Sequence, residues 1–486
     1  MASLSLELML ALARDLWPVL VSLFHLACAS AVTVHALLNK REVHTAIGWI
    51  ALAWLAPLLG ALLYLMLGVN RIQRAGVALG LKDAWHGQGC HVAAASEANG
   101  TSLPELSGIN RLACGITDRN LLSGNAVTPL VQGDEAFPAM LAAIDSARHS
   151  VTLLSYIFND DAAGRPFLEA LVRAKGRGVQ VRVLIDAVGA RYSRVSMVRR
   201  LRQAGVPVAA FLPPRLTRLL AQANLRNHRK IMVVDGALGF TGGMNISASH
   251  WLSRQPPKAF QCLHFSVRGP VVTDLQRTFA IDWGFTTGET LLGSPWFADN
   301  PPCGPVLARG VSDGPDADID HMRLVMLGAL ATARQRVRIV TPYFLPDNVL
   351  LTTLQVTALR GVVVDIVLPG RSNLPLLDWA MRPQFAELVA SGCRVHLTGP
   401  AFDHTKLFLV DDAWSLIGST NWDARSLRLN FEYNLECHDA ALVQQLDVLV
   451  NERIRRAHRL SEAELAGQSL PGRLRDRLVW LLSPYL

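Results

Sequence analysis

The sequence predicts an α/β protein in which two homologous domains follow a membrane hairpin of two helices. Three observations support this fold class. Two long apolar runs open the chain, strand-like and helix-like segments alternate after about residue 125, and one polar motif occurs twice. The chain has 486 residues, and 50% of them are hydrophobic, which is more apolar than most soluble proteins.

Each of the two apolar runs has the length of a membrane span. They extend over residues 16–38 and 46–67, and about 20 apolar residues suffice to cross about 30 Å of hydrocarbon. A cleaved signal peptide is the alternative for the first run, because residues 27–29 (ACA) resemble a cleavage site. The run continues past that site and a second run follows at once, so a hairpin within residues 1–70 is the favoured interpretation.

Basic residues beside the hairpin give its expected orientation. Two lie in the connecting loop and four on the outer flanks: Lys40 and Arg41 against Arg14, Arg71, Arg74 and Lys82. This excess on the flanks favours both termini, and therefore the two domains, on the cytoplasmic side. The net charge of +8 favours an anionic partner, either nucleic acid or acidic lipid.

Behind the hairpin, apolar strand-like runs alternate with segments of helical spacing, and the second half repeats the plan of the first. This alternation predicts βαβ units with a parallel or mixed sheet in each half. The predicted units are a membrane hairpin at 1–70, a linker at 71–124, a first domain at 125–285, a connection at 286–320 and a second domain at 321–486. We expect the second domain to end in a short interfacial helix, because the C-terminus mixes Arg with Leu, Trp and Tyr. An ordinary packing helix is the alternative.

The motif that occurs twice is H-x-K-x-x-x-x-D. It comprises His228, Lys230 and Asp235 in the first half and, 176 residues later, His404, Lys406 and Asp411 in the second. Alternate residues of a strand point the same way, so each His is expected beside its Lys. An ammonium group can bind phosphate oxygens, and His can be a nucleophile or a proton carrier near neutral pH. Only six lysines occur in the chain, and their use at both positions indicates that a compact ammonium is needed.

A glycine-rich turn that ends in asparagine follows each motif. The turn GFTGGMN ends at Asn245, and LIGSTN ends at Asn421. Backbone N–H groups and the asparagine amides of such turns can bind the same phosphate oxygens. The two sets of residues therefore predict a phosphate-binding site whose chemistry needs neither a metal ion nor a cofactor.

The doubled motif and its turns resemble the phospholipase D superfamily over roughly residues 125–486. The resemblance implies two α/β/α sandwich domains whose motifs face each other in one active site. It also implies that one histidine attacks a phosphodiester and becomes a phosphohistidine. The other histidine would protonate the leaving alcohol and then deprotonate the incoming one.

Within this superfamily the chain resembles the bacterial cardiolipin synthases. The segments that support this are the second apolar run, IDAVGA, TPYFLPD, RSLRLNFEYNL and LLSPYL. The resemblance implies a multi-pass protein of the bacterial inner membrane that uses phosphatidylglycerol, meets anionic lipids and binds no nucleic acid. A membrane-anchored phospholipase D that uses water, a phosphatidyltransferase with another acceptor, and a nuclease remain as alternatives; the two apolar runs disfavour the nuclease.

The resemblance also assigns roles to single residues. His228 and His404 would be the nucleophile and the acid–base pair, with their order left open, while Asp235 and Asp411 complete the motifs and are mainly structural. The residues that would hold the phosphate are Lys230, Lys406, Asn245 and Asn421. Gly243 and Ser419 would occupy the turns, and the carboxylate of Glu432 would orient the second-half histidine. Cys262 lies where many relatives have an acidic residue, so His228 is expected either to lack its carboxylate partner or to have Gln261 or another residue in its place.

Overall fold

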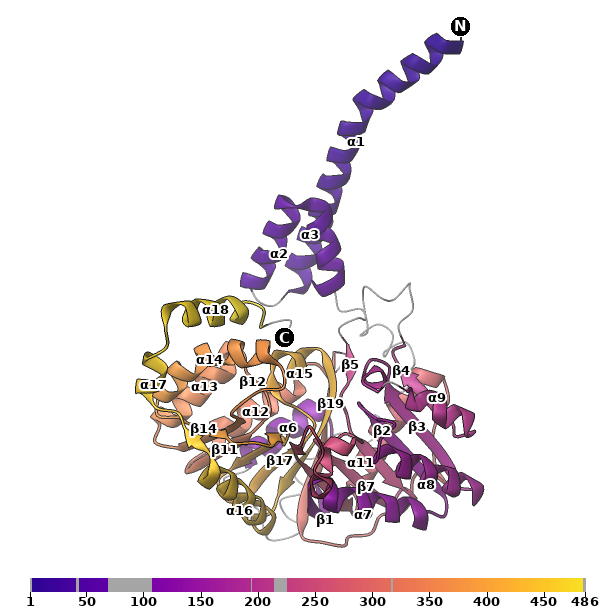
Figure 1. The fold of residues 1–486 in the computed structure, drawn as a ribbon, viewed down its shortest axis with the longest axis vertical. Coiled ribbons are helices and arrows are strands. Elements are labelled where there is room, and N and C mark those ends of the chain that lie inside the picture. Colours follow the sequence, from indigo (N-terminus) through magenta and orange to yellow (C-terminus); the bar gives the residue numbers. More distant parts are fainter. Residues whose placement is uncertain are drawn as a thin grey trace. The chain divides into compact units, whose positions relative to one another are not determined.

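The computed structural model describes residues 2–40, 43–68, 107–193, 195–213, 225–315 and 318–483. These residues form two compact units, one within residues 2–68 and one within residues 107–483 (Figure 1). The first unit is helical, and the second is a mixed α/β structure that contains both copies of the motif.

The N-terminal unit contains one helix that is long and apolar enough to cross a membrane. Among the described residues, only Leu16–Asn39 of helix α1 (Ala2–Asn39) meets this condition. The second apolar run forms three shorter pieces instead: α2 (Val43–Leu55), α3 (Pro57–Leu63) and a π-helical turn (Tyr64–Gly68). Pro57 separates the first two, because proline cannot donate to the preceding turn and its ring crowds that turn.

These shorter helices pack against α1. The hydroxyl of Tyr64 lies 2.7 Å from Nδ1 of His35, the indole of Trp54 donates to Thr33, and Lys40 donates to the carbonyl of Gly68. Small and aromatic side chains fill the contact: Val32, Ala36, Trp49, Ala53 and Tyr64. The second apolar run thus turns back on itself at Pro57, and both of its ends lie beside the C-terminal end of α1.

The α/β unit is built on one 16-stranded sheet in the described part of the chain. Outward from the central pair β1 (Leu122–Val131) and β10 (Val306–Asp313), the strands follow equivalent orders in the two halves. In the first half these strands are β9 (Leu263–Arg268), β7 (Leu238–Gly242), β6 (Ile231–Val234), β2 (Ser150–Ser155), β3 (Gln180–Asp186) and β4 (Val208–Phe211). In the second half they are β19 (Asn430–His438), β17 (Trp414–Gly418), β16 (Leu407–Val410), β11 (Arg336–Val340), β13 (Val363–Pro369), β14 (Arg394–Thr398) and the added β20 (His458–Arg459).

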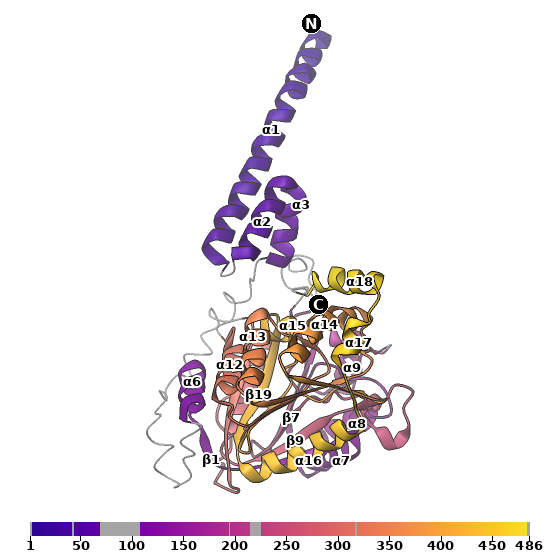
Figure 2. The same ribbon diagram turned by 90° about the vertical axis from the view of Figure 1, so that its left-hand side faces the viewer.

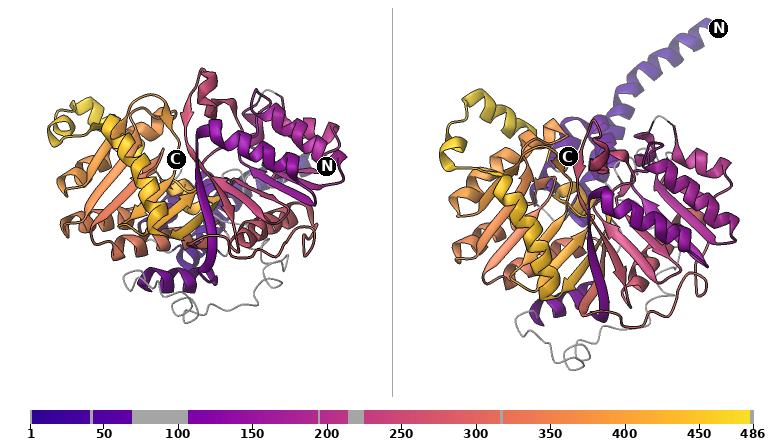
Figure 3. Two further views of the ribbon diagram at one scale, coloured as in Figure 1. Left: turned by 90° about the horizontal axis from the view of Figure 1, so that it is seen from below. Right: turned by 60° about the horizontal axis from the view of Figure 1, so that its bottom comes forward.

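Five shorter strands lie outside this path: β5 (Arg226–Asn227), β8 (Phe260–Gln261), β12 (Phe344–Leu345), β15 (Phe402–Asp403) and β18 (Trp422–Asp423). Strand β5 joins β19, β8 pairs with β15, and β12 pairs with β18. An isolated bridge joins Phe158 to Ile246. Figure 3 shows the two halves side by side, the first coloured mainly magenta and the second orange to yellow. The equivalent order is the structural form of the internal repeat expected from the sequence.

Helices cover both faces of each half. In the first half α7 (Gln132–Ser146), α8 (Gly164–Gly176) and α9 (Met197–Gln203) belong to one layer and α11 (Val272–Thr287) to the other. Met232 and Val234 of β6 face the first layer, whereas the alternate residues point away from it, as the pleat requires. The second half has α12 (His321–Thr332), α13 (Asn348–Leu359) and α14 (Pro375–Ala390) on one face and α16 (Ala440–Arg456) as the counterpart of α11.

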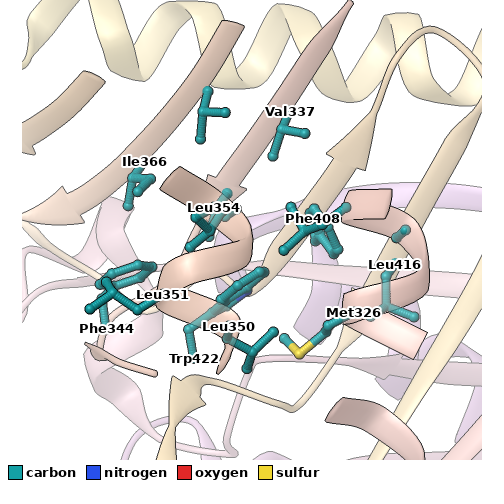
Figure 4. Packing of buried hydrophobic residues seen from close by; sticks show 14 of the residues in the cluster. Met326, Val337, Phe344, Leu350, Leu351, Leu354, Ile366, Phe408, Leu416 and Trp422 are labelled. Atoms are coloured by element: carbon teal, nitrogen blue, oxygen red, sulfur yellow. The ribbon is translucent and has the colours of Figure 1, made fainter. Parts of the chain in front are cut away.

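The second-half core shows how these layers are held. Leu350 and Leu354 of α13 lie over Val337 and Ile366 of the sheet, beside Phe408 (Figure 4). Each side chain is no more than 2% exposed, and burying a side chain of this size stabilises the fold by about 1.5–3 kcal/mol. The remaining helices of this half are the short α15 (Ala424–Arg428), α17 (Glu462–Ala466) and α18 (Leu470–Trp480).

The structure differs from two predicted boundaries. The predicted linker at 71–124 contains helix α6 (Ser107–Thr117), because Ile109 and Ala113, one helical turn apart, are buried in the second-half core. The predicted connection at 286–320 contains β10, which pairs with β1 and β19 at the centre of the sheet.

Candidate active site

The two His-Lys pairs lie just before strands rather than within them. His228 and Lys230 connect β5 to β6, and His404 and Lys406 connect β15 to β16. All four side chains belong to buried residues. Lys406 Nζ donates to the carbonyl of His404 at 2.7 Å and lies within 3.2 Å of both ring nitrogens of His404. The expected proximity of each His to its Lys is therefore present although the regular strand starts later.

Each histidine is anchored to the other half of the molecule. The backbone N–H of His228 donates to the carbonyl of Phe431 at 2.9 Å, where β5 pairs with β19. The N–H of His404 donates to the carbonyl of Gln261 at 2.7 Å, where β15 pairs with β8. This exchange brings both motifs to the seam between the halves, so that they share one site.

His228 is bound to a buried carboxylate. Its Nδ1 lies 2.9 and 3.0 Å from the two oxygens of Glu432, which is 0% exposed. Ser419 and Asn430 also donate to that carboxylate, at 2.5 and 3.2 Å. A carboxylate at Nδ1 keeps the proton there and leaves the lone pair of Nε2 free. The expectation that Glu432 orients the second-half histidine is wrong, because the carboxylate crosses the seam to the first-half histidine.

His404 has no such carboxylate. Its Nδ1 lies 3.1 Å from the carbonyl oxygen of Gly243. Gly242 pairs with His264 in the first half, just as Gly418 pairs with Asn434 in the second. Cys262 lies two positions before His264, and Glu432 lies two positions before Asn434. Cys262 therefore occupies the position equivalent to Glu432. The thiol of Cys262 donates to the carbonyl of His404 at 3.4 Å. The histidine that lacks a carboxylate is therefore His404, and the expectation for His228 is corrected.

Burial and charge set the protonation of these groups. Burial, opposed by Glu432, lowers the pKa of His228 to about 4. Burial and the neighbouring Lys406 hold the pKa of His404 well below its usual value. Burial raises the pKa of the Cys262 thiol to about 12, so it stays neutral. Burial alone would raise the pKa of Glu432, but His228 and the surrounding donors lower it, so the carboxylate remains charged.

The two lysines act on the site as a pair. Burial lowers the pKa of Lys230 to about 7 and that of Lys406 to about 8, and the charge of each lysine reaches the histidine of the other motif. Lys230 Nζ also lies 5.5 Å from the ring centre of Tyr156. Two buried ammonium groups so close together repel each other, and a bound phosphate anion would offset that repulsion.

The glycine-rich turns bring polar groups to the same place. Asn245 Oδ1 accepts from the backbone N–H of Ile157 at 3.2 Å, and buried Asn421 Oδ1 has no hydrogen-bond partner among the described residues. A Cβ atom at Gly243 would come within 2.9 Å of Cys262 Sγ and 3.0 Å of the His404 carbonyl. Glycine therefore permits the contact with His404.

Asp235 and Asp411 lie at the far ends of β6 and β16 and support the fold. Both adopt a left-handed conformation, with φ of 52° and 50°. Each carboxylate accepts hydrogen bonds from three successive backbone N–H groups, at residues 148–150 and 334–336. They close equivalent turns in the two halves and are bonded to the start of the neighbouring strand rather than to the histidines.

Several aromatic residues of the site were not predicted. The ring of Tyr156 lies 5.1 Å from that of His228, whereas Phe260, Phe402 and Tyr343 lie 6.2, 6.2 and 6.5 Å from that of His404. Tyr156 follows β2 and Tyr343 follows β11, and these strands hold equivalent places in the two halves. That equivalence was the signal available in the sequence. They resemble ordinary strand residues in a single sequence.

Comparison with known proteins agrees with this architecture. A family model described as "Cardiolipin synthase, PLD-like domain" matches residues 140–283 and 326–454, and one described as "Phospholipase_D-nuclease N-terminal" matches residues 28–68. The chain is 33% identical to cardiolipin synthase A of Pseudomonas putida, covering 96% of this chain and 97% of the relative. It is 30% identical to the cardiolipin synthase of Geobacillus kaustophilus, over 98% and 97%.

A solved structure supports the fold of the α/β unit. Phosphatidylserine synthase of Haemophilus influenzae superposes with a TM-score of 0.58 at 17% sequence identity, covering 78% of this chain and 100% of that protein. At that identity the likeness concerns the fold alone.

Proposed function

The chain belongs to the cardiolipin synthase family with phospholipase D-like domains, and on that premise we propose that it joins two phosphatidylglycerol molecules into cardiolipin and free glycerol. The family relatives carry that name along almost the whole chain length. The reaction exchanges one phosphodiester for another, so it needs no external energy source. The site supplies the two histidines and the two cations that such an exchange requires.

The pairing of His228 with Glu432 carries the assignment of roles. We propose that Nε2 of His228 attacks the phosphorus of the first phosphatidylglycerol while the bond from phosphorus to the glycerol oxygen breaks. Attack leaves a positively charged phosphoimidazole, which the ionised Glu432 at 2.9 Å stabilises. Neutral His228, with its proton held on Nδ1, is the form that the nucleophile needs.

His404 then moves the protons. A bound phosphodiester anion raises its pKa, because it offsets the charge of Lys406. The protonated ring gives its proton to the departing glycerol oxygen. Neutral again, it takes the proton of a free hydroxyl on the second phosphatidylglycerol, whose oxygen attacks phosphorus as the bond to His228 breaks.

The remaining predicted residues hold the phosphate. Lys230 and Lys406 supply positive charge, and the amides of Asn245 and Asn421 lie on the turns beside them. We propose that these four side chains contact the phosphate oxygens, while Ser419 and Gly243 position the groups on either side. Because the donors are buried and fixed, they stabilise developing charge without reorganising.

The testing experiment uses the purified full chain in detergent with phosphatidylglycerol labelled in its glycerol headgroup. We expect labelled glycerol and cardiolipin in equal amounts, and neither with the His404→Ala variant. Phosphatidic acid with glycerol would instead identify a hydrolase, and a product with another alcohol, added in competition, would identify a different acceptor. Absence of all products would overturn the proposal.

We also propose that the second apolar run returns across the membrane, which would make the protein a multi-pass inner-membrane protein with cytoplasmic domains. The length of the second run supports this, because residues 46–67 are apolar and about 20 such residues suffice to cross the hydrocarbon. The described fold brings both ends of that run together, where Lys40 donates to the carbonyl of Gly68, so the test must separate a span from a helical turn that stays on one side. Alkaline phosphatase, active only outside the cytoplasm, would be fused after Lys40 and after Gly68. We expect high phosphatase activity only in the fusion after Lys40. High phosphatase activity in both fusions would show that only the first run crosses the membrane.

A further inference from the structure

Helix α18 turns its leucines away from the protein. Its sequence, LPGRLRDRLVW, continues into Leu481 and Leu482. Successive leucines are separated by about one helical turn and so share one face. They are among the exposed large side chains of the molecule: Leu470 65%, Leu474 56%, Leu478 65%, Leu481 64% and Leu482 49%. We call this row the leucine stripe.

The opposite face of α18 carries a buried charge. Asp476 is 1% exposed, and its carboxylate accepts hydrogen bonds from Gln468 at 2.6 Å and from the guanidinium of Arg475 at 2.6 Å. That guanidinium lies 4.5 Å from the ring centre of Trp379 on α14. Trp480 packs against the second-half core. The contact of Arg475 with Trp379 and the packing of Trp480 hold the helix on the second half, so the exposed leucines are not the result of a loosely attached end.

This arrangement is the reverse of a helix on the surface of a soluble domain. Such a helix buries its apolar stripe and exposes its charged residues, and large exposed apolar patches mark interaction sites. The nature of the partner follows from the cations at the edges of the stripe. By the helical repeat, Arg473 and Arg477 lie along one edge of the stripe, whereas Arg475 on the other edge is paired with Asp476.

A groove continues the cationic edge. It has a volume of about 580 Å³ and lies between α14, α17 and α18, which are neighbours in Figure 2. Arg382, Arg473 and Arg477 line it together with the acidic Glu462 and Asp476 and the apolar Ala386, Leu465 and Leu474. Guanidinium groups beside apolar walls suit an anionic phospholipid, with its phosphate on the cations and its acyl chains beside the leucines.

We propose that the leucine stripe of α18 inserts into the interface of a bilayer that contains anionic phospholipid, with the flanking arginines on the lipid phosphates. Leucine side chains on one face and arginines at its edges are the chemistry that binds such an interface. The proposal does not depend on the enzymatic activity. It concerns a second membrane contact, within the α/β unit, in addition to the apolar N-terminal helices.

Photocrosslinking of the full chain in nanodiscs tests this contact. A benzophenone amino acid would replace Leu478, and the matched control would carry it at Val448, a 59% exposed residue of α16, at the opposite end of the α/β unit in Figure 1. We expect lipid adducts at position 478, increasing when phosphatidylglycerol replaces phosphatidylcholine, and none at 448. Crosslinks from position 478 to a second copy of the chain, or no adduct there, would overturn the proposal.

A kinetic comparison tests the same contact by another route. The double variant Leu474→Asp and Leu478→Asp should raise the apparent KM for phosphatidylglycerol in vesicles about tenfold or more, because two apolar side chains leave the interface. Its rate with a short-chain, monomeric phosphatidylglycerol should match that of the natural chain, which also shows that the variant is folded. Val448→Asp should change neither value. An unchanged KM on vesicles would contradict the membrane contact.

Discussion

The two halves of the active site have equivalent strands and different partners for their histidines. In one, Nδ1 of His228 meets the charged Glu432; in the other, Nδ1 of His404 meets the carbonyl of Gly243, and Cys262 occupies the place of the carboxylate. A carbonyl can hold the proton on Nδ1 but supplies no net charge to an imidazolium. The comparison teaches that two halves with the same backbone can take different catalytic roles, nucleophile and acid–base, when they differ at one equivalent position, here Glu432 and Cys262.

The largest expected effect comes from removing each histidine in turn. His228→Ala should abolish both turnover and the covalent intermediate, roughly 10³-fold or more, because no nucleophile remains. His404→Ala should lose turnover similarly but still form the intermediate from a substrate whose leaving group needs no proton, such as a nitrophenyl ester. Acid-quenched samples with radiolabelled phosphatidyl donor measure it. An intermediate in the His228 variant and not in the His404 variant would reverse the assigned roles.

Removal of the charge on the carboxylate should have the next largest effect. Glu432→Gln keeps the size of the side chain but removes the charge and can present an amide N–H to Nδ1. We expect a fall in kcat of about 100-fold or more, since both the tautomer and the imidazolium lose their support. Asn430→Ala, which removes one weaker donor to the same carboxylate, is the matched control and should cost far less. Equal losses in the two variants would argue against the role of the charge.

Much of this comparison was predictable from sequence because it depends on local patterns. The spacing of His228 and Lys230, repeated at His404 and Lys406, specifies the residues of the site, and alternation of apolar residues specifies the strands that hold them. Even the departure at Cys262 was visible. Its consequence was assigned to the wrong histidine, because a sequence does not show that β5 crosses to β19 and β15 to β8.

Other features escaped because they depend on long-range packing. Helix α6 is short and follows a polar stretch, and it is explained by the burial of Ile109 and Ala113 in a core formed mainly by residues after 310. The faces of α18 could not be assigned either: its amphipathic pattern fits burial or exposure of the leucines equally well. The burial of Asp476 and the packing of Trp480 against the second-half core decide between them.

A carboxylate placed on the second histidine should make the halves more alike. Cys262→Asp would put a negative charge near His404 and raise its pKa. His404 must be protonated to donate to the leaving glycerol, so the alkaline limb of the kcat profile should move up by about one pH unit. The change in maximal rate should stay below about tenfold, because the geometry of the motif remains. Cys262→Ser is the neutral control, and its profile should keep the position of the natural chain. No displacement between the Asp and Ser variants would show that this position does not influence His404.

The smallest effect concerns the lysines, which differ between the halves in pKa as the histidines differ in partner. Lys230 has a pKa lowered to about 7 and Lys406 one lowered to about 8, in both cases chiefly by burial. An ammonium group loses its charge above its pKa, so affinity for the phosphate should weaken as the pH rises through these values. Bound phosphate raises both pKa values, so KM should increase several-fold while kcat holds to higher pH.

Arginine at each position separates the two contributions, because guanidinium stays charged throughout this range. Lys230→Arg and Lys406→Arg should each remove the contribution of one ammonium group to the rise in KM, whatever the loss in absolute rate. The measurement is KM against pH between about pH 6 and pH 9 for the three proteins. A KM that is independent of pH in the natural chain would mean that both lysines remain charged without substrate. In that case burial would not separate the two halves at their lysines, and the difference between them would be confined to Glu432 and Cys262.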